Sequence, residues 1–169
     1  MKIIDWIKGL FCDKAYVVYL DPDLPELAEI HGGDWVDLRA ASFKILKGEA
    51  IIPEDGSGIT YAKGALIEIG LGFSMTPPKG KESIIAPRSG TNEKYSLIQG
   101  NSIGVIDESY AGTADEWKIR FYAFSAGYAQ RYDRIAQFRT QKKMRRIRFI
   151  PVSFSKKDNR GGFGSTGRA

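Results

Sequence analysis

Cysteine and histidine are nearly absent from this sequence, which has one of each, Cys12 and His31, among its 169 residues. One cysteine cannot form a disulfide within the chain, and one cysteine with one histidine does not supply the ligands of a zinc site. The sequence therefore predicts a protein of a reducing compartment. Any metal that it uses is expected to bind through oxygen ligands.

Long hydrophobic runs are also missing. The apolar stretches are short and are interrupted by Lys, Glu or Gly, whereas a membrane-spanning helix needs about 20 consecutive apolar residues. Residues 1–14 begin with an apolar stretch that contains Asp5 and Lys8, and we interpret them as an N-terminal extension that docks on the body. The composition, 43% hydrophobic and 27% charged, is that of a soluble globular domain with no membrane partner.

The sequence does contain a series of short strand signals. Turn clusters rich in Gly, Pro and Asn separate them, and the body shows no long helical period with capping residues. We therefore expect residues 15–152 to form one all-β domain, a barrel or jelly roll. The predicted strands cover residues 15–20, 43–46, 65–69, 83–86, 96–98, 104–106, 117–124 and 146–152.

Positive charge is concentrated near the C-terminus. Residues 1–130 contain 13 Lys or Arg and 18 Asp or Glu, whereas residues 131–169 contain 12 and 2. The densest part, residues 142–148, is called the basic segment; it contains Lys142, Lys143, Arg145, Arg146 and Arg148. Such a segment is typical of a solvated strand or loop, of a nucleic-acid-binding stripe or of part of a polyphosphate site.

The last residues, 153–169, are rich in glycine and contain the stretch Gly-Gly-Phe-Gly-Ser-Thr-Gly. Glycine-rich backbone exposes many N–H donors to a phosphate group, and Arg160, Ser165 and Thr166 are suitable phosphate ligands. Phe163 could stack on a base, which contributes about 1–3 kcal/mol. Alone, such a segment would be a mobile tail, and we expect a flexible arm.

Two further segments combine polar groups with a tight turn. Residues 87–90, Pro-Arg-Ser-Gly, present a guanidinium and a hydroxyl beside a glycine. In residues 101–112, Asn101 and Asp107 bracket a short apolar strand that is followed by Tyr110. These groups could read a base edge, activate water and pack a sugar, but an ordinary turn and an ordinary hairpin remain alternatives.

Two segments carry weaker signals. Residues 34–40 offer the carboxylates of Asp34 and Asp37 near an apolar strand, where they could hold water around a hard cation. Residues 133–137 end in the amide of Gln137. Either segment could be purely structural.

Taken together and in order, five segments resemble the five motifs of the homotrimeric dUTPase family, the dUTP nucleotidohydrolases. Each motif alone is a weak signal, but five in the family's order, including Gly-Val-Ile-Asp-x-x-Tyr-x-Gly and Gly-Gly-Phe-Gly-Ser-Thr-Gly, are specific. The motifs correspond to residues 37–40 (motif I), 87–90 (motif II), 101–112 (motif III), 134–137 (motif IV) and 160–167 (motif V).

The resemblance implies a dUTPase-like β-barrel or jelly roll that forms a homotrimer, with shared active sites and the C-terminal arm, residues 153–169, exchanged between subunits. It implies hydrolysis of dUTP to dUMP and pyrophosphate with Mg²⁺ on the triphosphate, which limits uracil in DNA and supplies dUMP for thymidylate synthesis. The Asp-Trp pair before motif I and the long basic link after motif IV resemble Gram-positive bacterial and phage members. A cytoplasmic location, in a bacterial or phage-infected host cell, follows from that resemblance.

The resemblance also implies a role for single residues. Asp107 would be the catalytic base that activates the attacking water. Asp37 would hold water near the metal, with Asp34 as its rival because one residue more than usual separates Gly33 from Asp37. The implied substrate contacts are Asn101, Gly104 and Ile106 at the uracil, Tyr110 under the deoxyribose, Arg88, Ser89, Gly90 and Gln137 at the phosphates, and Arg160, Phe163, Gly164, Ser165 and Thr166 in the arm, with Phe163 stacked on uracil.

Two alternatives remain. The related dCTP deaminases share the fold, but the continuous motif III and the complete glycine-rich motif V argue against a deaminase. A dUTPase-like regulatory protein would bind a protein or nucleic-acid partner through the basic segment, and such binding would coexist with catalysis.

Overall fold

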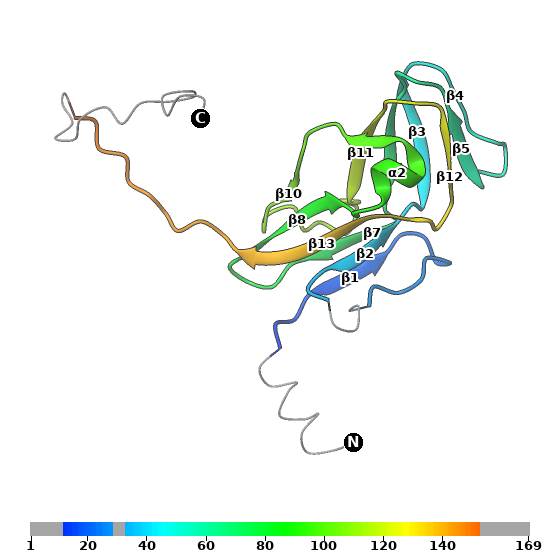
Figure 1. The fold of residues 1–169 in the computed structure, drawn as a ribbon. Helices are drawn as coiled ribbons and strands as arrows, with labels where there is room; N and C mark the ends of the chain where they lie inside the picture. Colours follow the sequence, from blue (N-terminus) through cyan, green and yellow to red (C-terminus); the bar gives the residue numbers. More distant parts are fainter. Residues whose placement is uncertain (1–11, 29–32, 153–169) are drawn as a thin grey trace.

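The computed structural model of the chain describes residues 12–28 and 33–152. These residues form thirteen strands and one short helix, so the expectation of an all-β fold is confirmed (Figure 1). Within these ranges no helix has the length and apolar character needed to cross a membrane. In chain order the elements are β1 (Tyr16–Tyr19), β2 (Val36–Arg39), β3 (Ser42–Lys47), β4 (Ala50–Ile51), β5 (Gly58–Tyr61), β6 (Leu66–Gly70), β7 (Phe73–Thr76), β8 (Lys81–Pro87), α2 (Thr91–Tyr95), β9 (Leu97–Gln99), β10 (Gly104–Ile106), β11 (Lys118–Ala123), β12 (Gly127–Gln130) and β13 (Arg134–Lys142).

The strands are arranged in two four-stranded sheets and two smaller ones. The first large sheet has the order β10-β8-β13-β2, and the second has the order β3-β6-β11-β9. Strands β12, β5 and β4 form a third sheet, and β1 pairs with β7. In Figure 1 the sheet of β8, β13 and β2 lies below the strands β3, β11 and β12, so the two groups enclose the core between them.

Strand β11 illustrates how the sequence produces these sheets. Its residues alternate between exposed and buried, with Ile119, Phe121 and Ala123 facing inward. In β6, Ile69 lies opposite Ile119 and Ile67 lies opposite Phe121, and these side chains are buried as well. Opposed apolar side chains on one face of an antiparallel pair pack directly against each other. This face is therefore the centre of the core.

Trp117 connects the core to the sheet that contains β13. Its side chain is fully buried, and its ring centroid lies 5.1 Å from that of Phe73 in β7 and 5.2 Å from that of Phe138 in β13. Tilted and edge-to-face aromatic pairs contribute about 0.5–1.5 kcal/mol each beyond their burial. Trp117 directly follows residues 107–116, so its packing fixes the end of that loop.

Replacing Trp117 with alanine is expected to lower the free energy of unfolding by about 3–5 kcal/mol, because the cavity would not refill completely. Urea unfolding followed by circular dichroism measures this loss. Tyr128→Ala, which removes a half-exposed aromatic side chain of β12, is the matched control and should cost much less. A loss below about 1 kcal/mol for Trp117→Ala would contradict the packing described.

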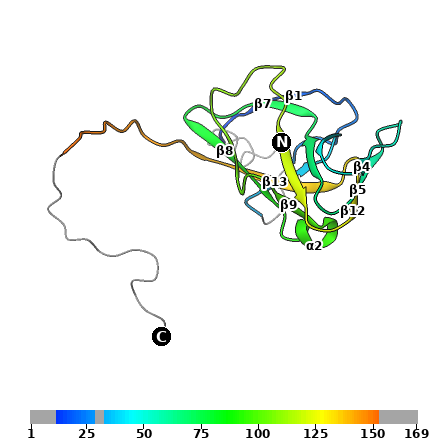
Figure 2. The ribbon, with the colours of Figure 1, turned by 90° about the horizontal axis from the view of Figure 1, so that it is seen from above.

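Seven of the eight predicted strands correspond to β1, β3, β6, β8, β9, β10 and β11, but the eighth prediction, residues 146–152, is wrong. Residues 143–152 leave the body after β13 without regular structure (Figures 1 and 2). A strand needs a neighbour that accepts its backbone hydrogen bonds. Within the described part of this chain no strand pairs with residues 146–152.

Some elements were not predicted from the sequence. Strand β7 has three buried residues in a row, Phe73, Ser74 and Met75, so it lacks the alternation that identifies a half-exposed strand. Helix α2 begins directly after the predicted turn at residues 87–90 and is too short to show a helical period. Most of the predicted N-terminal extension and the entire arm, residues 153–169, lie outside the described residues.

Candidate active site

The sheet β10-β8-β13-β2 carries four of the five motif segments. Motif I lies in β2, motif IV begins β13, motif II starts at the end of β8, and motif III includes β10. Segments that are up to about a hundred residues apart in the sequence thus lie on adjacent strands. Motif V, with Arg160, Phe163, Gly164, Ser165 and Thr166, lies outside the described residues.

Asp37 is the centre of an ion-pair cluster on this sheet. Register places it opposite Gln137, and its side chain is 12% exposed. Its Oδ2 accepts a hydrogen bond from Arg134 Nη1 at 3.1 Å. Its Oδ1 lies 2.6 Å from Arg88 Nε as an ion pair without hydrogen-bond geometry. Asp37 therefore holds the arginines of motifs II and IV side by side.

The turn of motif II is held by a threonine that the sequence analysis did not identify. Thr91 Oγ1 accepts the backbone N–H of Arg88 at 3.0 Å and donates to the carbonyl of Ile135 at 3.0 Å. Gln137 Nε2 donates to the carbonyl of Pro87 at 3.2 Å, so β13 holds the turn from two positions. The exposed groups of Ser89 and Gly90 project from this fixed turn.

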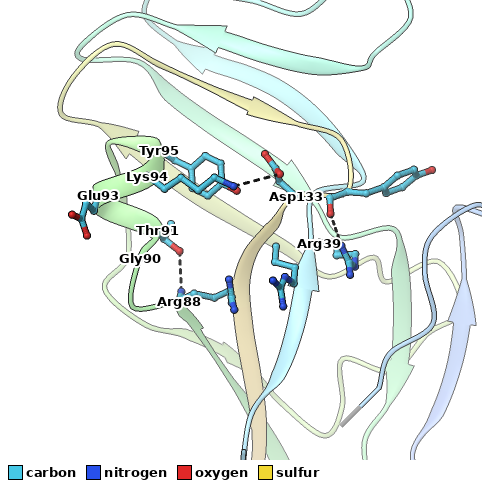
Figure 3. Close-up of a pocket in the computed structure, with 10 residues that line it drawn as sticks. Arg39, Arg88, Gly90, Thr91, Glu93, Lys94, Tyr95 and Asp133 are labelled. Atoms are coloured by element: carbon cyan, nitrogen blue, oxygen red, sulfur yellow. Dashed lines mark hydrogen bonds and ion pairs between the residues drawn. The ribbon is translucent and has the colours of Figure 1, made fainter. Parts of the chain in front are cut away.

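A cavity of about 400 Å³ opens beside this turn (Figure 3). Four of the side chains that line it are cationic, and they come from β2, the turn after β8, α2 and β13. Lysine and arginine groups that converge in this way bind phosphate oxygens through charge-assisted hydrogen bonds. Two of the cations are themselves held, because Arg39 Nη1 donates to the carbonyl of Tyr132 at 2.8 Å and Lys94 Nζ lies 3.9 Å from Asp133 Oδ1.

The turn between β9 and β10, which joins the two large sheets, borders a second recess of about 510 Å³, lined in part by Asn101 and Gly104. The carbonyl of Asn101 accepts the N–H of Ile103 at 2.6 Å, and its side-chain Oδ1 accepts from Gln99 Nε2 at 3.2 Å. These two hydrogen bonds hold the turn. Ile106, half-buried, ends β10 on the same motif.

Asp107 and Tyr110 lie on the loop that follows β10. Asp107 is exposed, and its carbonyl accepts the N–H of Tyr110 at 3.0 Å, which closes a turn. The hydroxyl of Tyr110 donates to the carbonyl of Glu116 at 3.2 Å, while its ring stays 40% exposed. Ser74 Oγ in β7 donates to the carbonyl of Thr113 at 2.9 Å. The loop thus presents a carboxylate and an aromatic ring on a fixed support.

Glu108 links this loop to the start of the basic segment. Its Oε1 accepts the N–H of Gly80 at 2.7 Å, and its Oε2 pairs with Lys143. The hydrogen bond from Lys143, followed by that from Gly80, holds the pKa of Glu108 below its ordinary value. The residue next to Asp107 therefore stays ionised at neutral pH and anchors the loop.

The carboxylates of the described residues are dispersed and do not gather into a direct metal site. Residues 12–28 and 33–152 contain no group of three or more His, Cys, Asp or Glu side chains that could hold an ion directly. Asp37 is already paired with two arginines, and Asp34 is an exposed residue before β2. An ion carried by a polyphosphate would suit this donor set, because the ligand would supply most of the oxygens.

The comparisons with known proteins agree with these features. The dUTPase family model matches residues 62–167. A prophage-derived deoxyuridine 5′-triphosphate nucleotidohydrolase of Bacillus subtilis (strain 168) is 38% identical over 151 residues, which are 89% of this chain and 96% of that protein.

Solved structures of phage proteins share the fold. A Staphylococcus bacteriophage 80alpha dUTPase with dUpNHpp superposes with a TM-score of 0.65 and 16% identity, over 92% of this chain and 99% of that one. A dUTPase from phage phi11 of S. aureus, described with a structural Mg(II) ion, gives a TM-score of 0.61 and 14% identity over 84% of this chain and 98% of that one. The β-barrel or jelly-roll expectation is confirmed by these matches, and the chain belongs to the dUTPase family.

Proposed function

We propose that this chain hydrolyses dUTP to dUMP and pyrophosphate, in the cytoplasm of a bacterial or phage-infected host cell. The observation that carries the proposal is the gathering of motifs I to IV on the single sheet β10-β8-β13-β2. Cationic groups line a cavity at one end of this sheet, and a free carboxylate follows its edge strand at the other. Phosphate binding and water activation are the two functions that such a hydrolysis needs.

In the proposed reaction, Asp107 accepts a proton from a water molecule, whose oxygen attacks the α-phosphorus. The bond between the α-phosphorus and the oxygen that bridges to the β-phosphate breaks, and pyrophosphate leaves with that oxygen. A positioned general base contributes about 10²- to 10⁴-fold to such a step. Asp107 suits this role because it is exposed while its loop is fixed.

Mg²⁺ on the triphosphate, when bound, neutralises the phosphate charge and polarises the phosphoryl oxygens. Asp37 would hold water near it, and Asp34 is the rival for that role. Asp37 also keeps Arg88 and Arg134 in place at 2.6 and 3.1 Å, which supports a positioning role in phosphate binding.

The substrate contacts divide between the two ends of the sheet. The half-exposed ring of Tyr110 would lie under the deoxyribose, where a 2′-hydroxyl would not fit. The remaining proposed contacts are Asn101, Gly104 and Ile106 at the uracil, Arg88, Ser89, Gly90 and Gln137 at the phosphates, and Arg160, Phe163, Gly164, Ser165 and Thr166 of the arm, which closes over the bound nucleotide.

Homotrimer formation with shared sites is part of this proposal. Ile106 lies opposite Ser83 in the antiparallel β8–β10 pair, so Asp107 follows the end of the ladder that is far from Arg88. Arg88 lies five positions after Ser83, which at about 3.3 Å per residue is about 17 Å. The Arg88 and Asp107 of one chain are therefore poorly placed to act on one phosphorus atom. A second copy would supply the missing group.

Exposed apolar side chains support contacts between copies. In residues 146–152, four apolar side chains are exposed: Ile147 (51%), Phe149 (82%), Ile150 (70%) and Val152 (75%). Strand β1, at the edge of its two-stranded sheet, likewise exposes Tyr16 and Val18. Unpaired edges and exposed apolar segments are the usual places where chains add strands to one another. We therefore assign residues 146–152 to a neighbouring subunit's surface, with the arm continuing beyond them.

A panel of nucleotides tests the proposed reaction. Purified protein with Mg²⁺ should release pyrophosphate from dUTP. It should be at least about 10²-fold less efficient with dTTP, dCTP and UTP, because each of these nucleotides either loses a contact with the protein or clashes with it. Enzyme-coupled detection of pyrophosphate measures the four values of kcat/KM. Ammonia release from dCTP would identify a deaminase instead, and no pyrophosphate from dUTP would contradict the proposal.

The basic segment supports a second role, the docking of an acidic protein surface. Every residue from 142 to 148 is exposed. Reversing the charge of Lys142 and Arg145, which lie before the proposed intersubunit contact at residues 146–152, should weaken binding of such a partner while pyrophosphate release persists. Loss of both properties together would contradict a separate docking function.

A further inference from the structure

Gln99 is a polar side chain in an apolar position. It ends β9 and is 5% exposed, and both Leu97 on its own strand and Phe121 opposite it are fully buried. Its Nε2 donates to Asn101 Oδ1 at 3.2 Å, whereas its Oε1 is buried without a hydrogen-bond partner in the described chain. A leucine would fill this position without the cost of a buried, unpaired oxygen. The contact with Asn101 is therefore what the amide adds.

The hydrogen bond from Gln99 fixes which end of the Asn101 amide faces outward. An asparagine amide has an acceptor oxygen at one end and two N–H donors at the other. Oδ1 is engaged by Gln99 and the backbone carbonyl by Ile103, whereas the two Nδ2 donors have no hydrogen-bond partner in the described chain, and Asn101 lines the recess. Asn101 itself is exposed, so a ligand can reach them.

Gly104 provides the space that this arrangement needs. A Cβ at residue 104 would lie 3.3 Å from Gln99 Nε2 and 3.1 Å from Ile85 Cβ, both tighter than ordinary contacts. A side chain at this position would thus press on the amide that orients Asn101. Gly104 therefore leaves free the space in which Gln99 reaches Asn101.

The direction of the Asn101 amide determines whether it can form a hydrogen bond with uracil or with cytosine. Uracil presents a carbonyl oxygen at position 4, which accepts a hydrogen bond, and cytosine presents an amino group there, which donates one. We propose that Gln99 is a specificity-determining positioning residue, which holds the Asn101 amide with its N–H donors toward the base and so selects uracil over cytosine. This inference rests on the proposed function.

Removing the orienting hydrogen bond should weaken the discrimination. Gln99→Leu keeps the bulk of the side chain but lets the Asn101 amide turn either way. The ratio of kcat/KM for dUTP to that for dCTP should fall about twofold to tenfold, as expected for the loss of one hydrogen bond. The ratio for dUTP to UTP should stay unchanged, because the 2′-hydroxyl does not touch this amide.

Replacing the donor group of Gln99 with an acceptor should change the preference for uracil over cytosine more strongly. Burial raises the pKa of a carboxyl introduced by Gln99→Glu, and at a pH above that pKa the side chain only accepts hydrogen bonds, so it would bind Asn101 Nδ2 and turn Oδ1 toward the base. Binding of the non-hydrolysable α,β-imido analogues of dUTP and dCTP, measured by calorimetry, should then shift about 10²-fold in favour of the cytosine analogue. Gln130→Leu, at an exposed glutamine of β12, is the matched control and should change neither ratio.

The outcomes separate this inference from the proposed function. If the wild-type protein releases no pyrophosphate from dUTP, the proposed function fails. If it does, but Gln99→Leu retains the wild-type ratio of dUTP to dCTP, the role of Gln99 is overturned. An equal loss in the dUTP:dCTP and dUTP:UTP ratios would also overturn it, since that result would indicate a loosened turn between β9 and β10. If Gln99→Glu does not fold, Gln99→Leu alone decides.

Discussion

Asp107→Asn should lower kcat for dUTP by about 10²- to 10⁴-fold while the affinity for dUpNHpp changes little, because asparagine keeps the shape of aspartate but accepts no proton. The side chain is exposed, and the loop is held by backbone contacts and by Glu108. The substitution should therefore leave the thermal midpoint unchanged. Single-turnover kinetics and calorimetry measure the two effects separately.

Asp55→Asn is a suitable control for this experiment. Asp55 is an exposed carboxylate in the turn between β4 and β5, away from the sheet that carries the motifs. Its substitution should therefore leave kcat unchanged. Turnover of Asp107→Asn close to that of the wild type would contradict the assignment of the base. A parallel loss of nucleotide binding would instead indicate that Asp107 holds the substrate.

Mixing two inactive variants should restore activity if the sites are shared between chains. Arg88→Ala lacks a phosphate-binding group, and Asp107→Asn lacks the base. When equal amounts are refolded together, about one quarter of the sites in a symmetric oligomer combine an intact Arg88 from one chain with an intact Asp107 from another. Activity should therefore rise from almost none to about a quarter of the wild-type value.

The matched control refolds Arg88→Ala with a chain that carries both substitutions. No site in that mixture has both intact groups, so activity should stay near zero. Native mass spectrometry on differently tagged chains verifies that mixed trimers have formed. Mixed trimers without recovered activity would show that Arg88 and Asp107 act within one chain.

Strands with one solvent-exposed face and one buried face were predictable from the sequence. Strand β11 alternates strictly, so its position follows from the sequence. Strand β7 is buried over most of its length, and periodicity cannot identify such a strand. Residues 146–152 have the apolar composition of a strand, but pairing depends on a neighbour, and the described chain provides none.

The candidate site was predictable where motifs are contiguous in the sequence. Arg88 and Asp107 belong to such motifs. Thr91, Gln99 and Glu108 were not singled out, because their roles depend on contacts with Ile135, Asn101 and Lys143 that only the fold creates. A threonine directly after motif II, or an amide in an otherwise apolar strand, is the signal that could have drawn attention to the first two.

The most direct test of the account follows the attacking oxygen. The protein would be incubated with dUTP and Mg²⁺ in water enriched in oxygen-18, and the masses of the products would be measured by mass spectrometry. Attack at the α-phosphorus predicts dUMP with one heavy oxygen and unlabelled pyrophosphate. Label in pyrophosphate, formation of dUDP with labelled phosphate, or no turnover at all would contradict the proposed reaction.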